Sequence, residues 1–166
     1  MLFLILVPLS HGAVIVQKGT SKTAWIAEGV ETALSVAKAV PGETVMASLS
    51  ISQFKNMPVS DNIQTVVICA DNDLPNAQGK KNISDAASNY LALGKQVFIT
   101  MPPEIPVEIK KYDFNDLLKR GGIARVREVL DTRIEIKSAE VLKKQETSLL
   151  TDLEKIKQAG LETPRN

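Results

Sequence analysis

The run Thr65-Val66-Val67-Ile68-Cys69-Ala70 constrains the fold most, because six consecutive apolar or β-branched residues predict a strand buried on both faces. Such strands are typical of the centre of a parallel sheet. Other β-rich segments lie at residues 13–17, 24–28, 44–48 and 95–101, and segments with helical periodicity at 30–37, 51–56, 83–91, 113–119 and 123–130. This alternation predicts an α/β fold with a mainly parallel central sheet flanked by helices on both faces.

Composition limits the classes of protein that this chain can represent. Its 166 residues suffice for one domain. With 20 Lys and Arg against 19 Asp and Glu, the net charge of +1 gives no support for a protein that coats DNA through bulk positive charge. The single cysteine, Cys69, excludes an intrachain disulfide and a cysteine-based zinc cluster within one chain, and it fits a reducing compartment such as the cytoplasm.

The first residues form an apolar run, Leu2 to Val7, that ends at Pro8. The run is far shorter than the ~20 residues that a membrane helix needs, and it lacks the basic start of a signal peptide. We expect a strand that pairs as a hairpin with Ala13–Gln17 across the turn Ser10-His11-Gly12. An opening inside a buried strand suggests that the chain is a piece of a longer polypeptide, and no membrane association is expected.

At the other end, Glu135–Gln158 has apolar residues at roughly helical spacing among mixed charges, which predicts one amphipathic helix. We therefore expect a domain at residues 1–133, with a hairpin in 1–20 and a core in 24–121, followed by a helix and tail at 134–166. The helix either is a solvated helix that lies on the core or links to another domain, which is the common arrangement, or it binds a partner.

Acidic residues follow the predicted strands, where ligands of open α/β sheets bind. Glu28 ends one strand, Asp71 and Asp73 follow the central strand, and Asp113 comes after the next strand and a proline-containing loop. Carboxylates that converge at one edge repel one another, and a hard cation such as Mg²⁺, Mn²⁺ or Ca²⁺ relieves the repulsion. Each residue also has a structural alternative: Asp-x-Asp is common in turns, and Asp113 with Asp116 is typical of a helix N-cap.

Three segments together resemble a Toprim domain, a family found in primases, topoisomerases and related nucleases. They are Glu28-Gly29-Val30-Glu31-Thr32-Ala33-Leu34-Ser35, then Ala70-Asp71-Asn72-Asp73 with Gly79-Lys80-Lys81, then Tyr112-Asp113-Phe114-Asn115-Asp116-Leu117-Leu118. The resemblance covers about residues 13–121 and is greatest to the Toprim modules of plasmid and phage primase-like proteins, including those of conjugative relaxases.

The resemblance implies a Rossmann-like sheet in which Glu28 is an acid/base or metal-associated group. It implies that Asp71 and Asp73 bind Mg²⁺ or Mn²⁺, with Asp113 assisting. Thr32 stands where many primases have an aspartate.

Two functions follow as expectations. The first is Mg²⁺-dependent phosphoryl or nucleotidyl transfer on nucleic acid, with single-stranded DNA as the expected partner beside other domains of a parent chain. Lys80 and Lys81, shortly after Asp73, could contact a phosphate, or they could be solvated lysines without a function. The alternative is a non-catalytic module that binds DNA or a protein partner in a larger relaxase. A small-molecule α/β enzyme ranks last, because the sequence lacks a glycine-rich cofactor loop.

Overall fold

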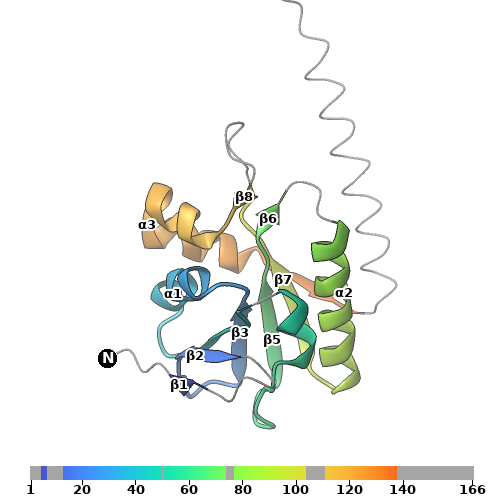
Figure 1. Ribbon diagram of the computed structural model, residues 1–166. Helices are drawn as coiled ribbons and strands as arrows, with labels where there is room; N and C mark the ends of the chain where they lie inside the picture. The colour runs from blue at the N-terminus through green and yellow to red at the C-terminus, as the bar shows by residue number, and fades with distance from the viewer. Residues whose placement is uncertain (1–4, 7–12, 50, 74–76, 104–110, 138–166) are drawn as a thin grey trace, which may run out of the picture.

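The computed structural model describes residues 5–6, 13–49, 51–73, 77–103 and 111–137. Within them, seven strands form one sheet in the order β1-β2-β4-β3-β5-β7-β9 (Figure 1). The strands are β1 (Ile5–Leu6), β2 (Val14–Gln17), β3 (Thr23–Ala27), β4 (Thr44–Ala47), β5 (Thr65–Cys69), β7 (Gln96–Thr100) and β9 (Ile134–Ile136). The four central strands are parallel, whereas β1, β2 and β9 run antiparallel to their neighbours.

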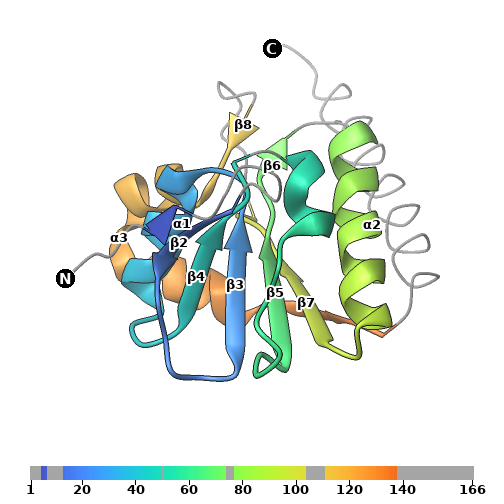
Figure 2. The ribbon, with the colours of Figure 1, turned by 60° about the horizontal axis from the view of Figure 1, so that its bottom comes forward.

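Helices cover both faces of this sheet (Figure 2). Helix α1 (Val30–Ala39) and helix α3 (Phe114–Asp131) cover one face, and α2 (Ala77–Ala92) with the short 3₁₀ helix η2 (Ile51–Asn56) covers the other. The side chains of β5 alternate between the two resulting cores: Val67 packs in the layer of α1 and α3, and Val66 and Ile68 pack in the layer of α2. The predicted α/β fold with a mainly parallel sheet is therefore confirmed.

A second, two-stranded ribbon lies beyond the carboxyl end of the sheet. Strand β6 (Asn72–Asp73) pairs antiparallel with β8 (Lys111–Tyr112), with Asn72 opposite Tyr112 and Asp73 opposite Lys111. The Asn72 side-chain amide also donates a 2.7 Å hydrogen bond to the Pro102 carbonyl. This ribbon connects the end of β5 to the start of α3.

The N-terminal pairing agrees with the sequence, because β1 and β2 are antiparallel with Ile5 opposite Ile15. The predicted turn at 10–12 lies outside the described residues. None of the helices in the described ranges has the length and apolar character needed to cross a bilayer.

The helix predicted from Glu135 is wrong at its beginning. Glu135 and Ile136 belong to β9, which pairs with β7 through Val97 and Phe98, and the Ile136 side chain is buried. The sheet thus extends past the expected boundary at residue 133, because a buried isoleucine on the last strand completes the core. The rest of the predicted helix, from residue 138, lies outside the described residues.

Candidate functional site

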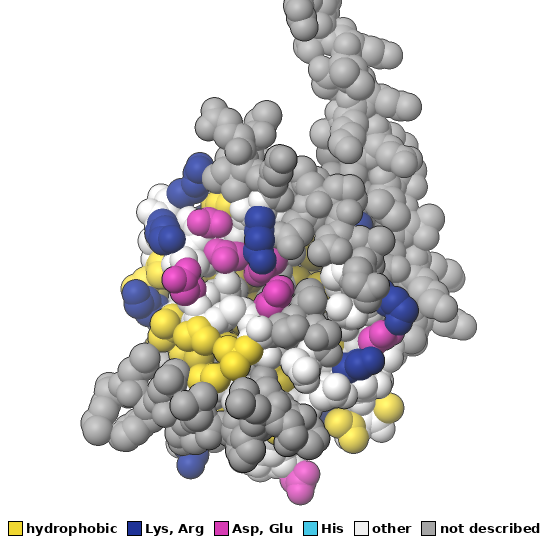
Figure 3. Space-filling model, in the orientation of Figure 1, with side chains coloured by type: hydrophobic (Ala, Val, Ile, Leu, Met, Phe, Trp, Pro, Cys, Tyr) yellow, Lys and Arg dark blue, Asp and Glu magenta, His cyan; other side chains and the backbone are white. Residues whose placement is uncertain are grey.

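Two of the predicted acidic residues, Glu28 and Asp71, lie just after the ends of neighbouring strands. Strands β3 and β5 pair in parallel with Ala27 opposite Cys69, so Glu28 and Asp71 emerge side by side from the carboxyl edge. Asp113 reaches this edge from the other direction, because β8 pairs with β6 and α3 packs on α1. Figure 3 shows acidic side chains gathered on this face, with lysine and arginine side chains around them.

Asp71 has the most unusual environment in this group. Its side chain is only 7% exposed, and Oδ2 lies 2.9 Å from Nζ of Lys111. Its other oxygen, Oδ1, is buried and has no hydrogen-bond partner among the described residues. The pKa of Asp71 is raised to about 6: burial is the largest cause, the charges of Asp113 and Glu28 add to it, and Lys111 opposes the shift. The influence of both carboxylates on Asp71 shows that the three groups share one electrostatic environment.

Asp113 has a structural role that the sequence also suggested. It is the N-cap of α3, and its Oδ1 accepts hydrogen bonds from the backbone amides of Asn115 (2.8 Å) and Asp116 (2.9 Å). The Asp116 side chain accepts in return from the Asp113 backbone amide, which completes a capping box. The second carboxylate oxygen of Asp113, Oδ2, accepts a hydrogen bond from the Thr32 hydroxyl at 3.1 Å.

Thr32 therefore has a structural role at the position where the resemblance would place an aspartate. Its hydroxyl ties α1 to the N-cap of α3, where a carboxylate would repel Asp113. A second link joins the same helices, because the Asn115 amide donates to Glu31 Oε2 at 3.1 Å. The helices that position Glu28 and Asp113 are thus held together next to the acidic group.

The ion pair of this acidic group is not formed by either of the predicted lysines. Lys81 pairs with Asp85 on its own helix at 2.7 Å, and in the described part of the chain neither Lys80 nor Lys81 forms an ion pair with Glu28, Asp71 or Asp113. Lys111, which sequence reasoning missed, is the lysine that reaches Asp71. The sequence offered one indication of this role, since Lys111 lies two residues before Asp113. Only the pairing of β8 with β6, however, brings Lys111 to Asp71.

The donor chemistry fits a hard divalent cation. Carboxylate oxygens are the ligands that Mg²⁺ and Mn²⁺ prefer, and Asp71 Oδ1 is a buried acceptor without a donor from the described residues. The described side chains do not by themselves bring three or more metal-binding groups around one point. Asp73 is described only through its backbone, in β6, so its predicted role as a ligand stays a prediction.

Cys69 ends β5 directly beneath this edge and has no exposed surface. Burial raises the pKa of its thiol, and the charge of Asp71 raises it further, so the thiolate needed for nucleophilic chemistry is strongly disfavoured. The interpretation of Cys69 as a small buried hydrophobic residue agrees with this environment.

Comparisons with known proteins agree with the geometry. Residues 23–124, more than half of the chain, match the family described as Toprim domain. The fold is also similar to the crystal structure of the Aquifex aeolicus primase (zinc-binding and RNA polymerase domains), with a TM-score of 0.51 and 22% sequence identity. That similarity covers 69% of this chain and 27% of the primase chain, and at this identity it shows a shared fold alone. No curated protein matches the sequence significantly.

Proposed function

The chain belongs to the Toprim domain family, and on that premise we propose that it is the Toprim module of a DNA-processing protein of the primase-like or conjugative-relaxase type. The proposed activity is phosphoryl or nucleotidyl transfer on DNA, single-stranded in the first instance, with Mg²⁺ or Mn²⁺. Other domains of a parent chain would supply the remaining functions, because the chain spans only 27% of the primase chain to which its fold is similar.

The environment of Asp71 supports this proposal most directly. A carboxylate that is 7% exposed, with one oxygen lacking a donor from the described residues and a pKa raised to about 6, is costly to keep charged. A divalent cation would offset this cost by compensating the negative charges of Asp71, Glu28 and Asp113 together. Proteins keep such costly charges mainly where function needs them.

Each residue has a distinct proposed role. Asp71 and Asp73 would hold the cation, and Asp113 would support them from the N-terminus of α3. Glu28 would act as general acid/base or as a further ligand. Mg²⁺ bound there would neutralise a phosphate and stabilise the attacking and leaving oxygens.

The alternative is a non-catalytic module that binds DNA or a protein partner. Two observations favour it: Lys111 already compensates Asp71, and Thr32 provides a hydroxyl where many primases have a carboxylate. In either case the buried thiol of Cys69 suits a cytoplasmic protein.

Metal titration separates the two functions. Thermal unfolding of the full chain is followed with increasing Mg²⁺ or Mn²⁺ after EDTA treatment, for the natural protein and for the double variant Asp71→Asn/Asp73→Asn. At ten times the dissociation constant a bound ion adds about 1.4 kcal/mol, which raises the midpoint by about 3–6 °C. The double variant should lose this metal-induced shift.

The double variant Asp61→Asn/Asp131→Asn is the matched control, because both of its aspartates are exposed. It should keep the natural metal-induced shift. An unchanged melting curve of the natural protein across the titration would reject the metal-dependent function. DNA binding that survives both EDTA and the Asp71→Asn/Asp73→Asn change, in a protein whose melting curve does not respond to metal, would instead support the binding module.

A further inference from the structure

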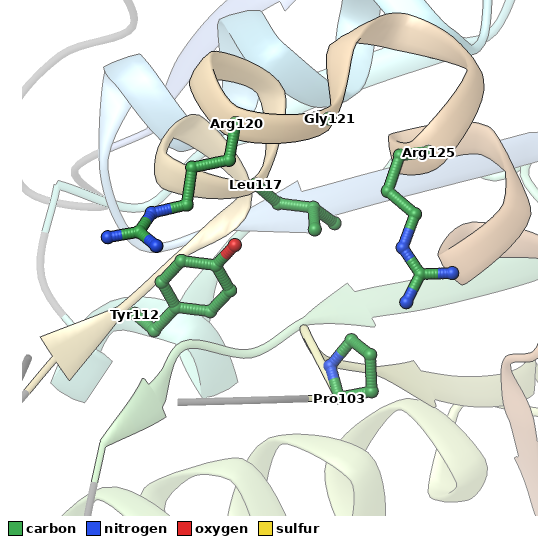
Figure 4. A pocket seen from close by; sticks show the side chains of 6 residues that line it. All are labelled: Pro103, Tyr112, Leu117, Arg120, Gly121 and Arg125. Atoms are coloured by element: carbon green, nitrogen blue, oxygen red, sulfur yellow. The ribbon is translucent and has the colours of Figure 1, made fainter. Parts of the chain in front are cut away.

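A pocket of about 350 Å³ lies beside the acidic group and includes none of its predicted residues. It is lined by Pro103, Tyr112, Leu117, Arg120, Gly121 and Arg125. Figure 4 shows Arg120 and Arg125 descending from α3 on either side of Leu117, with the Tyr112 ring near Arg120 and Pro103 below Arg125. Two arginine side chains therefore line one hollow, together with Leu117, Tyr112 and Pro103.

A break in α3 brings these two arginines to one pocket. In an uninterrupted helix, side chains five positions apart diverge by about 140°, since each residue turns the helix by about 100°. Gly122 interrupts α3 with φ 70°, a value that L side chains rarely adopt. At Gly121, an added Cβ would lie 2.7 Å from Cβ and Cγ of Arg125. Both glycines are thus needed for the observed placement of Arg125.

The charges of the pocket are predominantly positive. Arg120 stacks over the Tyr112 ring at 6.0 Å and has no carboxylate partner within the described ranges. Arg125 donates to Glu128 at 2.8 Å, but both side chains of this pair are exposed, and such pairs are weak enough to exchange for a better anion. Because Tyr112 and Leu117 are each only 5% exposed, they offer little surface for stacking a base.

We propose that this pocket binds a phosphate group, supplied by a nucleic-acid strand or by a nucleotide. Guanidinium groups bind phosphate oxygens through paired, charge-assisted hydrogen bonds. The choice of phosphate rests on the proposed function, but the pocket requires no metal. Tyr112 is the last residue of β8, between Lys111, which pairs with Asp71, and Asp113, which caps α3, so the pocket lies next to the acidic group.

The test uses the full chain and a fluorescein-labelled single-stranded oligonucleotide, with binding measured by fluorescence anisotropy in EDTA at low salt. We expect Arg120→Ala to weaken binding roughly fivefold and to lower the salt slope by about one counterion. Lys119→Ala is the matched control. It also removes one positive charge, and Lys119 is next to Arg120 in the sequence but does not line the pocket. It should change binding less than twofold.

Gly121→Ala separates geometry from net charge. It keeps every charge but moves Arg125, so it should weaken binding as Arg120→Ala does, provided that its melting curve remains cooperative. Equal losses in Arg120→Ala and Lys119→Ala, or no loss in Arg120→Ala, would overturn the proposal. Competition by ATP at micromolar concentration would identify a nucleotide as the source of the phosphate, and competition only by unlabelled oligonucleotide would identify a strand.

These outcomes are independent of the metal-dependent function. In EDTA the Asp71→Asn/Asp73→Asn variant should bind the oligonucleotide at least as tightly as the natural protein, because it removes only negative charge. A protein that fails the metal titration but passes this test keeps the phosphate pocket and loses the catalytic proposal.

Discussion

At the scale of single residues, Asp71 is the residue of the candidate site whose negative charge is most costly, because it is buried near two other carboxylates. Its carboxylate is buried beside Glu28 and Asp113, and one lysine, Lys111, compensates one of its oxygens. Lys111 is itself half exposed, with 53% of its side chain accessible, so another cation can compete with its ammonium group for Asp71. The buried carboxylate of Asp71 is therefore stabilised by any one of three partners: a proton, an ammonium group or a metal ion.

The cost of this buried charge predicts a pH-dependent stability. The pKa of Asp71 in the folded protein, about 6, lies above its ordinary value, so between about pH 4 and pH 6 the folded state binds a proton that the unfolded state has lost. Stability from this group is therefore lost as the pH rises through that window. In EDTA, Asp71→Asn should raise the free energy of unfolding at pH 7 by about 1 kcal/mol and have little effect at pH 4.

Denaturant unfolding at both pH values measures this difference. Asp61→Asn is the control, because Asp61 is exposed, and it should change neither value. A variant Asp71→Asn that is less stable than the natural protein at pH 7 would show that the Lys111 ion pair outweighs the cost of burying the carboxylate.

At the scale of elements, the N-cap of helix α3 has both a structural role and a candidate functional one. Asp113 caps the helix with Oδ1 and accepts from Thr32 of α1 with Oδ2, so one carboxylate fixes both the start of α3 and its position against α1. The cap alone explains an aspartate at this position. Capping needs only an oxygen that accepts hydrogen bonds, whereas binding a cation would also need the negative charge of Asp113.

Two substitutions of Asp113 separate these roles. Asp113→Ala removes the cap and should lower the free energy of unfolding by about 1–2 kcal/mol, whereas Asp113→Asn keeps a good N-cap and should cost less than about 0.5 kcal/mol. If Asp113 also supports a cation, the metal-induced rise in melting temperature should shrink in both variants. A full metal-induced shift in Asp113→Asn would limit Asp113 to capping.

At the scale of the whole molecule, β9 closes the sheet beside β7 and brings residue 136 into the core. The strand lies directly after α3, so it holds the end of that helix on the sheet while the capping box holds its start. The carboxyl edge is thus framed by a helix that is fixed at both ends.

A comparison of two isoleucines in β9 tests this arrangement. Ile136 is 2% exposed and Ile134 is 56% exposed, so Ile136→Ala should lower the free energy of unfolding by about 2–4 kcal/mol, against less than about 0.5 kcal/mol for Ile134→Ala. Chemical denaturation of both variants provides the measurement. Equal and small effects would mean that residues 134–136 are not part of the core.

The sequence by itself determined the features that depend on near neighbours along the chain. The continuous apolar run of β5 predicts a central strand, Asp113 with Asp116 predicts a capping box, and Gly121-Gly122 separates two helical segments that the structure joins across a kink. These features depend on side-chain periodicity and local hydrogen bonds, which a short stretch of residues specifies. The acidic residues at strand ends were predictable for the same reason.

Only the tertiary structure decided which distant residues meet. The two-residue strands β6 and β8 have no periodic signal, yet their pairing places Lys111 on Asp71. Likewise, β9 is a strand because β7 offers it an unpaired edge and the core accepts Ile136, although the charged sequence that follows favours a helix. Pairing and burial of this kind depend on partners far away in the chain, and local propensity gives way to them.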